Sequence, residues 1–397
     1  MNKNLGFKKP KQYIPFSPPM FGKEEEKAVI DVLRSGWVTT GPKAKEFEEK
    51  IAAYVGAKNA IATSSCTSAM LVALKALEIG KGDEVIVSPY TFVSTAHVIM
   101  HCGAKPVFVD VEEETGNIDI SKIEKKITKK TKAIIPVHYA GHSCRMDQIM
   151  VIAQNHNLYV IEDAAHAIGS EYKGKKIGSI GDITCFSFYA TKNIATADGG
   201  MAVTNDKDLA DKMRLLTIHG ISDARKIWHK RYQKPGSIHY DIIDLGYKCN
   251  MTDMCAAIGI CQLKKLDMFN KTRTEFSDIY DSAFKNNPAL AIPVIKDYTK
   301  SNRHLYPLLL NLNHLNINRD SFIDKLKKLN IGTSILFMPL HLHSFYKNEF
   351  NYKYGDFPVA EDLFERVVCI PVSPKIGKKS IKTIASAILY LVEKYKK

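Results

Sequence analysis

The sequence predicts an α/β protein built on a mainly parallel β-sheet, with a smaller domain towards its C-terminal end. Three observations lead to this fold class. Short apolar runs rich in β-branched residues alternate with helical segments between residues 59 and 204, which is typical of βαβ units. The chain has 397 residues, more than one core usually organises. After about residue 265, long lysine-rich helices and a few strands replace the alternation.

The individual elements follow from local signals along the chain. Residues 22–35 begin with acidic residues, carry apolar residues at helical spacing and end before Gly36, so they predict a helix. Further helices are expected at 44–55, 67–78, 93–101, 122–132 and 147–156. Strands are expected in the apolar runs 59–65, 83–89, 105–111, 132–141, 158–167, 182–188, 200–206 and 304–312. No long helix separates the strands at 182–188 and 200–206, so part of the sheet should be mixed.

The change of pattern also predicts the domain organisation. Residues 1–264 are expected to form an N-terminal segment and the large domain, and residues 265–397 the small C-terminal domain. No internal repeat or low-complexity segment interrupts either part.

The composition argues against several classes of protein. The formal charge is +14, but the lysines are spread along the chain without a recognition motif, so we expect no nucleic-acid partner. The eight cysteines form no C-x-x-C pair, which predicts neither a disulfide framework nor a zinc site. The N-terminal residues lack a following apolar run, and no apolar run approaches the roughly 18 residues of a membrane span. We therefore expect a cytoplasmic protein without a bound metal or membrane contact.

Lys192 stands in a setting that a solvated surface lysine does not need. It lies just past an apolar strand, among small hydroxyl residues and before a Gly-Gly pair, in the stretch FSFYATKNIATADGG. Such surroundings suit a lysine that must lose its proton and bond covalently to a ligand. The stretch therefore makes Lys192 a candidate catalytic residue.

Other polar groups occur at predicted strand ends, where ligands gather in open α/β sheets. Asp163 ends a strand in VIEDAAHA, and the alanines after it leave room for a flat ligand; helix capping is the structural alternative for this carboxylate. At the start of the predicted helix in SSCTSAM, N–H groups and hydroxyls could bind a phosphate, and the hydroxyls there belong to Ser64, Ser65, Thr67 and Ser68. No Walker A or complete G-x-G-x-x-G motif occurs.

These groups and Phe92 form a set that suits pyridoxal 5'-phosphate. The helix start would hold the phosphate, with Ser187 adding a hydroxyl, and Asp163 would pair with the pyridine nitrogen. Phe92 would stack on the ring, and Lys192 would hold the aldehyde as a Schiff base. Burial beside a cationic cofactor would lower the pKa of Lys192, which makes its amine able to attack and to carry protons.

Longer motifs resemble a known family. They are SGWVTTGPKAKEFE, SPYTFVSTAH, PVHYAGH, VIEDAAHAIGSEYKGKKIGSIGD, FSFYATKN, DGGMAVTND, LTIHG and GYKCNMTDMCAA. Over nearly the whole chain they resemble the DegT–DnrJ–StrS sugar aminotransferases. This resemblance implies fold type I of the pyridoxal-phosphate-dependent transferases, with a mainly parallel mixed sheet flanked by helices and a small C-terminal α+β domain. PFSPPM, SGWVTTGPK and GYKCNMTD are most similar to the enzymes that make UDP-4-amino-4-deoxy-L-arabinose.

The resemblance implies roles for individual residues. Lys192 matches the lysine that bonds to the cofactor, Asp163 the partner of the pyridine nitrogen, and His166 a residue beside the 3-hydroxyl group. The other expected cofactor contacts are Ser187, Thr67, Ser68, Cys66, Phe92, Ala165 and Asn250. Related sugar dehydratases have His where this chain has Lys192, so the lysine favours amino transfer.

The resemblance also implies a homodimer whose active site is shared between subunits. In GYKCNMTD, Lys248 and Asn250 occupy positions from which relatives reach the neighbouring subunit's phosphate. Cys249 and Asp198 depart from the usual tyrosine and glutamate, which concerns substrate specificity. Substrate contacts are expected from polar or aromatic groups near strand ends and domain seams, namely Trp37, Thr39, Thr40, Tyr139, His142, Lys248 and His341.

The expected reaction moves the amino group of L-glutamate, which becomes 2-oxoglutarate, to the 4-keto position of a nucleotide-linked sugar. A UDP-4-keto-pentose of the L-arabinose type is the first expectation, with a product used in cell-surface polysaccharide or lipid A modification. A UDP- or GDP-linked 4-keto-6-deoxyhexose is an alternative. A non-catalytic binding or regulatory protein on the same scaffold is a further alternative, against which the intact Asp163 and Lys192 argue.

Overall fold

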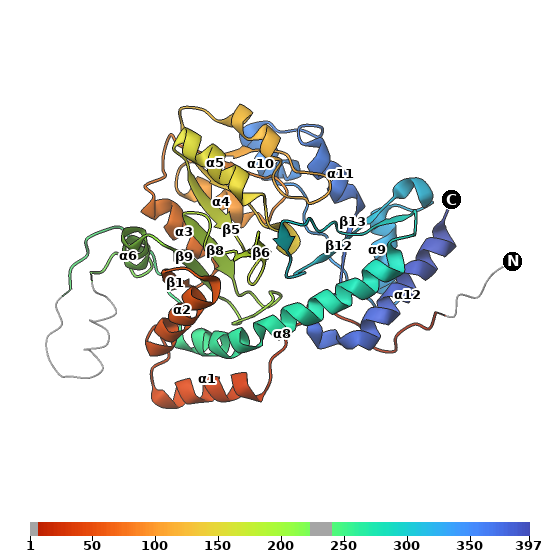
Figure 1. The fold of residues 1–397 in the computed structure, drawn as a ribbon, viewed down its shortest axis with the longest axis horizontal. Helices are drawn as coiled ribbons and strands as arrows, with labels where there is room; N and C mark the ends of the chain where they lie inside the picture. Colours follow the sequence, from red (N-terminus) through yellow and green to blue (C-terminus); the bar gives the residue numbers. More distant parts are fainter. Residues whose placement is uncertain (1–6, 223–239) are drawn as a thin grey trace.

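A seven-stranded sheet forms the centre of the molecule in the computed structural model, which describes residues 7–222 and 240–397. The strand order is β1-β9-β8-β5-β4-β2-β3 (Figure 1). The strands are β1 (Asn59–Thr63), β2 (Glu84–Val87), β3 (Lys105–Phe108), β4 (Thr131–Ile135), β5 (Tyr159–Asp163), β8 (Ile183–Ser187) and β9 (Gly200–Thr204). The pairs from β3 through β2, β4 and β5 to β8 are parallel, whereas β9 is antiparallel to both β8 and β1. The predicted mixed, mainly parallel sheet is confirmed.

Helices cover both faces of this sheet, so alternate residues of each strand enter different cores. Ile61 of β1 and Ile161 of β5 pack in the core beneath α3, α4 and α6. Their strand neighbours Ala60 and Val160 pack in the core beneath α2, α5 and α8. Burial on both faces is what a parallel sheet requires, and it explains the continuous apolar runs of the strands. These helices are α2 (Pro42–Val55), α3 (Cys66–Ala76), α4 (Ser94–His101), α5 (Met146–His156), α6 (Lys207–Leu216) and α8 (Asp253–Phe284), and α1 (Lys23–Ser35) packs on α8.

The C-terminal part of the chain builds a second, smaller sheet. Its order is β10-β12-β13, formed by Leu290–Ala291, Tyr306–Leu310 and Val367–Ile370. A third core joins this sheet to the helices α9 (Arg319–Lys328) and α12 (Gly377–Tyr395) and to the end of α8. The helices α10 (Ser344–Phe350) and α11 (Pro358–Arg366) contribute side chains to a core of the large sheet instead.

Helix α8 connects the two parts of the molecule as one continuous element (Figure 1). Its 32 residues span the predicted boundary between residues 264 and 265, so the division into domains stays a prediction. The remaining elements are short: a sheet of β11 (Thr299–Lys300), β6 (Glu171–Tyr172) and β7 (Lys175–Lys176), and the 3₁₀ helices Ile120–Lys122, Glu124–Lys126, Tyr139–Gly141, Leu312–His314, Leu340–Leu342 and Pro374–Ile376.

One predicted helix is wrong. Residues 122–132 form no α-helix, because the segment contains only parts of two 3₁₀ helices and the first residues of β4. The Thr131 hydroxyl accepts from the Thr128 N–H at 2.9 Å, and the Thr128 hydroxyl accepts from the Lys130 N–H at 3.1 Å. Threonine side chains that bond to nearby N–H groups stabilise a turn instead of a helix.

No helix within the described ranges combines the length and apolar character needed to cross a bilayer. Residues 1–6, which belong to the N-terminal stretch considered in the sequence analysis, lie outside the described residues.

Candidate active site

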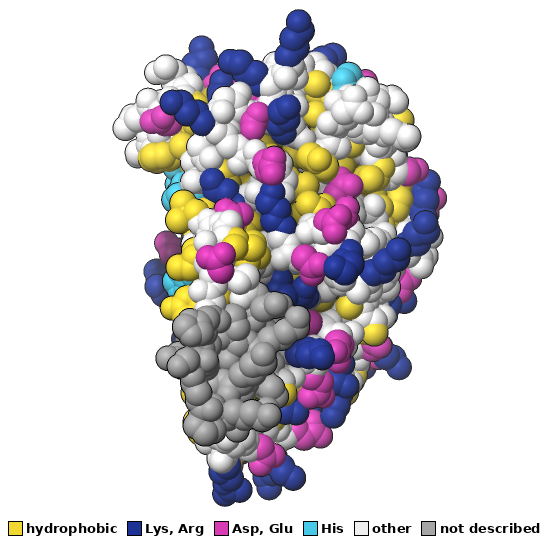
Figure 2. Space-filling view, turned by 90° about the vertical axis from the view of Figure 1, so that its left-hand side faces the viewer, with side chains coloured by type: hydrophobic (Ala, Val, Ile, Leu, Met, Phe, Trp, Pro, Cys, Tyr) yellow, Lys and Arg dark blue, Asp and Glu magenta, His cyan; other side chains and the backbone are white. Residues whose placement is uncertain are grey.

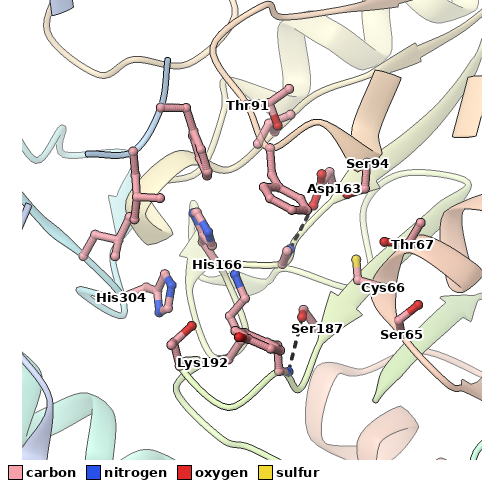
Figure 3. A pocket seen from close by; sticks show the side chains of 18 of the residues that line it. Ser65, Cys66, Thr67, Thr91, Ser94, Asp163, His166, Ser187, Lys192 and His304 are labelled. Carbon is pink, nitrogen blue, oxygen red and sulfur yellow. Dashed lines mark hydrogen bonds between the residues drawn. The ribbon is translucent and has the colours of Figure 1, made fainter. Parts of the chain in front are cut away.

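A cavity of about 460 Å³ lies at the carboxyl ends of the parallel strands. Asp163 is the last residue of β5 and Ser187 the last residue of β8, and both line the cavity. Figure 3 shows Lys192 pointing into the same space. Eight predicted site residues meet here: Cys66, Thr67, Phe92, Asp163, Ala165, His166, Ser187 and Lys192.

Lys192 is brought to the cavity by a turn that follows β8. Its N–H donates to the Tyr189 carbonyl at 2.9 Å, which closes that turn. Burial lowers the pKa of the Lys192 amine to about 8, while the charge of Asp163 and the thiol of Cys66 act in the opposite direction. A substantial fraction of the amine is therefore neutral near physiological pH, as a nucleophile or proton carrier requires.

The Asp163 carboxylate is buried and held by two donors. The Thr95 hydroxyl of α4 donates to its Oδ2 at 2.8 Å, and the Ala165 N–H donates to Oδ1 at 3.1 Å. Burial raises the pKa of Asp163, and these two hydrogen bonds and Lys192 oppose that rise. The site thus offers a fixed carboxylate to a cationic partner in the cavity.

The start of α3 forms one wall of the cavity. Ser65 caps the helix by accepting from the Ser68 N–H at 3.1 Å, and the hydroxyl-bearing residues Ser65, Thr67 and Ser187 line the cavity. The hydroxyl of Ser68 contacts that of Ser65 at 3.0 Å, and Ser68 does not line the cavity. Free N–H groups of a first helical turn together with hydroxyls suit a phosphate.

Gly200, in the Gly-Gly pair that follows Lys192, brings β9 against this helix start. A Cβ atom at Gly200 would lie 2.2 Å from the Ser65 carbonyl carbon and 2.4 Å from the Cys66 nitrogen. Backbone atoms cannot yield as a flexible side chain can, so any larger residue would displace the wall that holds the hydroxyls.

Aromatic and imidazole rings form another part of the cavity wall. Phe92 lines the cavity although 59 % of its surface is exposed. The His166 ring lies parallel to that of Phe337 at 5.9 Å and 4.4 Å from that of His304. Nδ1 of His166 is buried without a hydrogen-bond partner among the described residues, and burial lowers the pKa of this imidazole well below its usual range. Such an unpartnered atom suits a polar group brought by a ligand.

These groups fit pyridoxal phosphate. The Lys192 amine suits the aldehyde of that cofactor, and the Asp163 carboxylate suits its ring nitrogen. The hydroxyls at the start of α3 suit its phosphate, and a flat aromatic ring suits the face of its own ring. The unpartnered imidazole nitrogen suits its 3-hydroxyl group. The small side chain of Ala165 leaves space for a flat ring on the other side. The fold and the cavity together define a fold type I pyridoxal-phosphate-dependent transferase.

The chain belongs to the DegT/DnrJ/EryC1/StrS aminotransferase family, which it matches over residues 19–389. It is 53 % identical to the uncharacterized protein MJ1066 of Methanocaldococcus jannaschii over 380 residues, covering 96 % of this chain and 98 % of that protein. It is 47 % identical to the spore coat polysaccharide biosynthesis protein SpsC of Bacillus subtilis over 382 residues, covering 96 % and 97 %. It is 38 % identical over 390 residues to the UDP-4-amino-4-deoxy-L-arabinose–oxoglutarate aminotransferase of Shewanella sediminis, covering 96 % and 98 %.

Solved structures agree with this family. The sugar aminotransferase Spr1654 of Streptococcus pneumoniae, described as putative, is 34 % identical with a TM-score of 0.89, and the match covers 96 % of this chain and 99 % of that one. Its structures include forms with pyridoxal phosphate and with pyridoxamine phosphate. The chain is therefore a pyridoxal-phosphate-dependent sugar aminotransferase, and its particular sugar stays a prediction.

A group of predicted substrate and phosphate contacts lies outside the cavity. The Thr40 hydroxyl donates to the Met251 carbonyl at 2.5 Å, and the Asn250 amide nitrogen contacts that hydroxyl. Lys248 is exposed and donates to Asn250. Trp37 and Thr39 belong to the same loop: the Trp37 indole donates to the Thr40 carbonyl at 3.1 Å, and the carbonyl of Thr39, whose side chain is exposed, accepts from the Asp253 N–H at 3.1 Å.

Tyr139 and His142 line a different cavity of about 320 Å³. The Tyr139 hydroxyl donates to the Leu336 carbonyl, so this side chain supports a wall of the first cavity from behind. Burial lowers the pKa of His142 to about 4, and its Nε2 accepts from the Lys296 N–H at 3.2 Å.

His341 requires a correction. It is fully buried, its Nε2 lies 2.7 Å from Oε1 of Glu361, and it lines neither cavity. The prediction that it contacts substrate is therefore wrong for the described structure: an imidazole that pairs with a buried carboxylate can anchor α11 but cannot reach a ligand.

Some residues that line or support the cavity were not predicted, because they come from segments far from Lys192 and Asp163 in the sequence. Thr95 supports Asp163 from α4, Phe337 packs beside His166, and His304 lines the cavity just before β12. The motif SPYTFVSTAH contains Thr95, so a signal for it was available. Nothing in the local sequence around His304 or Phe337 distinguishes them from core residues.

Proposed function

We propose that the chain transfers the amino group of L-glutamate to the 4-keto group of a UDP-linked keto-pentose of the L-arabinose type. The product would be a 4-amino sugar for cell-surface polysaccharide or lipid A modification. The observation that carries the proposal is the buried Lys192 amine, with its pKa lowered to about 8, in one cavity with the Asp163 carboxylate. The names of two relatives support the sugar class, since one acts in polysaccharide biosynthesis and one makes a 4-amino sugar.

Lys192 acts twice in this mechanism. Its amine would hold the aldehyde of the bound cofactor. Once an amino donor has taken its place, the freed neutral amine would carry a proton from the donor's α-carbon to the former aldehyde carbon. In the second half-reaction Lys192 would carry a proton in the opposite direction, from that carbon to C4 of the acceptor sugar. When bound, pyridoxal phosphate supplies an aldehyde and an electron-withdrawing ring that stabilise the negative charge formed at the reacting carbon.

Asp163 and the surrounding walls keep this chemistry selective. The Thr95 hydroxyl and the Ala165 N–H fix the carboxylate so that it can bind a protonated ring nitrogen. The hydroxyls of Ser65, Thr67 and Ser187 would hold the phosphate, and Phe92 and Ala165 would enclose the ring and exclude water from its faces.

A partner subunit would complete the site. Among the described residues that line the cavity, Lys192 is the only lysine or arginine, although both proposed substrates carry negative charges. The segment after α6 exposes Ile242, Ile243 and Leu245 by 63, 61 and 88 %. Apolar side chains lie exposed between charged ones on the face of the molecule that carries α6 (Figure 2). We propose a homodimer in which Lys248 and Asn250 of one subunit extend the site of the other.

A UDP- or GDP-linked 4-keto-6-deoxyhexose is the second candidate acceptor. Leu305, Leu336 and Phe337 give the cavity an apolar wall, against which the methyl group of such a sugar could pack. A keto-pentose lacks that methyl group, so the two acceptors would use this wall differently.

The two half-reactions test the proposal separately. Addition of L-glutamate should change the visible absorption of the holoenzyme and yield 2-oxoglutarate, and a UDP-4-keto-pentose should then restore the spectrum and yield the 4-amino sugar. Ping-pong kinetics are expected. Lys192→Ala should slow both steps by about 10³-fold or more because the proton carrier is lost, whereas Lys45→Ala, at an exposed lysine, should leave both unchanged. If the enzyme prefers the 4-keto-6-deoxyhexose to the keto-pentose, the deoxyhexose is the acceptor. If the Lys192→Ala enzyme reacts at the normal rate, the mechanism is wrong.

A further inference from the structure

His304 lies in the wall of the cavity, although the sequence patterns predicted no role for it. The residue is 3 % exposed, and its ring lies 4.4 Å from that of His166. Figure 3 shows both imidazoles on the side of the cavity where the Lys192 side chain ends.

The hydrogen bonds around His304 define its tautomer. The Asn193 amide nitrogen donates to Oδ1 of Asn270 at 2.7 Å and to the Asn302 carbonyl at 3.3 Å. The amide oxygen of Asn193 therefore faces His304, whose Nδ1 lies 2.7 Å from it. An amide oxygen only accepts, so Nδ1 carries the proton. In the neutral ring, Nε2 is then left with a lone pair.

That lone pair is unpartnered within residues 7–222 and 240–397. His304 lines the cavity, and no described residue makes a hydrogen bond to its Nε2. A histidine that only supports the core normally satisfies both ring nitrogens. Here one nitrogen is tied to Asn193 and the other stays available at a catalytic cavity.

The backbone of His304 is also fixed on both sides. Its N–H donates to Oδ1 of Asn302 at 3.0 Å, and its carbonyl accepts from Nη1 of the buried Arg273 at 3.2 Å. Asn302 in turn donates to the carbonyls of His166 and Ile168 at 3.0 and 2.9 Å. These contacts join α8, the segment before β12 and the turn after β5, so the imidazole has little freedom to move away.

We propose that His304 is a positioning residue for Lys192: with the cofactor bound, its Nε2 accepts a hydrogen bond from the Lys192 amine once the amino donor has taken the place of that amine. The bond directs the freed amine towards the reacting carbon and keeps it from rotating out of reach. The inference rests on the aminotransferase reaction and is independent of which sugar accepts the amino group.

The charged and titratable groups around both side chains are consistent with this role. Burial lowers the pKa of His304 well below its usual range, and the charges of His166, Lys192 and Arg273 act in the same direction. The ring therefore stays neutral and keeps its lone pair. Asp163 and Cys66 act on Lys192, and both favour its protonated form against the effect of burial. An acceptor at His304 would add to that effect, because a hydrogen bond to the ammonium stabilises it.

Two substitutions separate positioning from a structural role. His304→Asn keeps an N–H for Asn193 but loses the acceptor at Nε2, whereas His304→Gln places an acceptor near Nε2 and loses the donor to Asn193. In the full-length protein reconstituted with pyridoxamine phosphate, which leaves the Lys192 amine free, the acetylation of Lys192 by acetic anhydride is measured by mass spectrometry across a range of pH. We expect the midpoint of labelling to move to lower pH in H304N and to stay near the wild-type value in H304Q.

The holoenzyme gives a second readout. The rate of the glutamate half-reaction should fall by about 10-fold or more in H304N, as expected for loss of a hydrogen bond to a charged group, with cofactor affinity retained. H304Q should recover part of that rate. Equal labelling midpoints in all three proteins, or H304Q slower than H304N, would show that the imidazole only anchors Asn193. Since labelling needs neither donor nor acceptor, its outcome does not depend on the proposed sugar.

Discussion

The Asp163 carboxylate illustrates how single residues shape this site. A buried carboxylate loses hydration, and burial alone would favour its neutral form. One hydroxyl, that of Thr95 at 2.8 Å, and one N–H, that of Ala165 at 3.1 Å, replace part of the lost hydration. The negative charge of Asp163, which a protonated ring nitrogen would require as its partner, therefore depends on Thr95, which lies 68 positions earlier in the sequence.

Thr95→Val should raise the pKa of Asp163, because the substitution removes the hydrogen bond that stabilises the ionised form. The carboxylate would then ionise only at higher pH. We expect the acidic limb of the pH profile of kcat/KM for L-glutamate to move to higher pH, with activity at neutral pH falling by about 10-fold. Thr95→Ser keeps the hydroxyl and should follow the wild-type profile. A Thr95→Val profile that overlies the wild type would contradict this role.

At the scale of elements, the cavity depends on the contact between β9 and the start of α3. The N-cap Ser65 and the strand residue Gly200 approach so closely that a side chain has no space. Sequence patterns predicted both elements and the hydroxyls, since capping residues and apolar runs are local signals. The lysine-rich segment 122–132 was predicted as a helix from the same kind of pattern and is not one, because turn hydrogen bonds of Thr128 and Thr131 compete with it.

Gly200→Ala should destabilise the protein by roughly 1–3 kcal/mol or more, because its Cβ would overlap backbone atoms of Ser65 and Cys66. The displaced helix start should also weaken binding of pyridoxal phosphate. Gly80→Ala is the matched control: its Cβ would meet only the Cys102 carbonyl oxygen at 3.6 Å, so its effect should stay within about 0.5 kcal/mol. Urea unfolding and cofactor titration measure both effects. Equal stability and cofactor affinity in the two variants would refute the close contact.

At the scale of the whole molecule, the separation of Lys192 from Asn250 indicates that two subunits would build each site together. Lys192 lines the cavity, whereas Asn250 contacts Thr40 in a cluster outside it. The chain carries a net charge of +14, yet the cavity has a single lysine among its described lining residues. A site completed by a second copy would resolve this difference between overall and local charge.

A mixed dimer tests this arrangement. Lys192→Ala and Asn250→Ala subunits carrying different tags can be coexpressed, and the heterodimer purified by both tags. If Asn250 serves the partner's cavity, one of the two sites is intact, and the heterodimer should have about half of the wild-type activity. If Asn250 serves its own subunit, the heterodimer should be no more active than the Asn250→Ala homodimer. A monomer in sedimentation velocity at assay concentration would contradict the dimer itself.

The sequence by itself determined the mixed sheet and most of its flanking helices, and it singled out Lys192 and Asp163, the residues proposed to carry the chemistry. Those features depend on local periodicity and on residue types whose chemistry is specific, so neighbouring residues suffice to predict them. Only the tertiary structure brought Thr95 to Asp163, His304 to the cavity wall and His341 to Glu361. These contacts join segments far apart in the chain, and which side chains meet is decided by packing in three dimensions, which local sequence patterns do not encode.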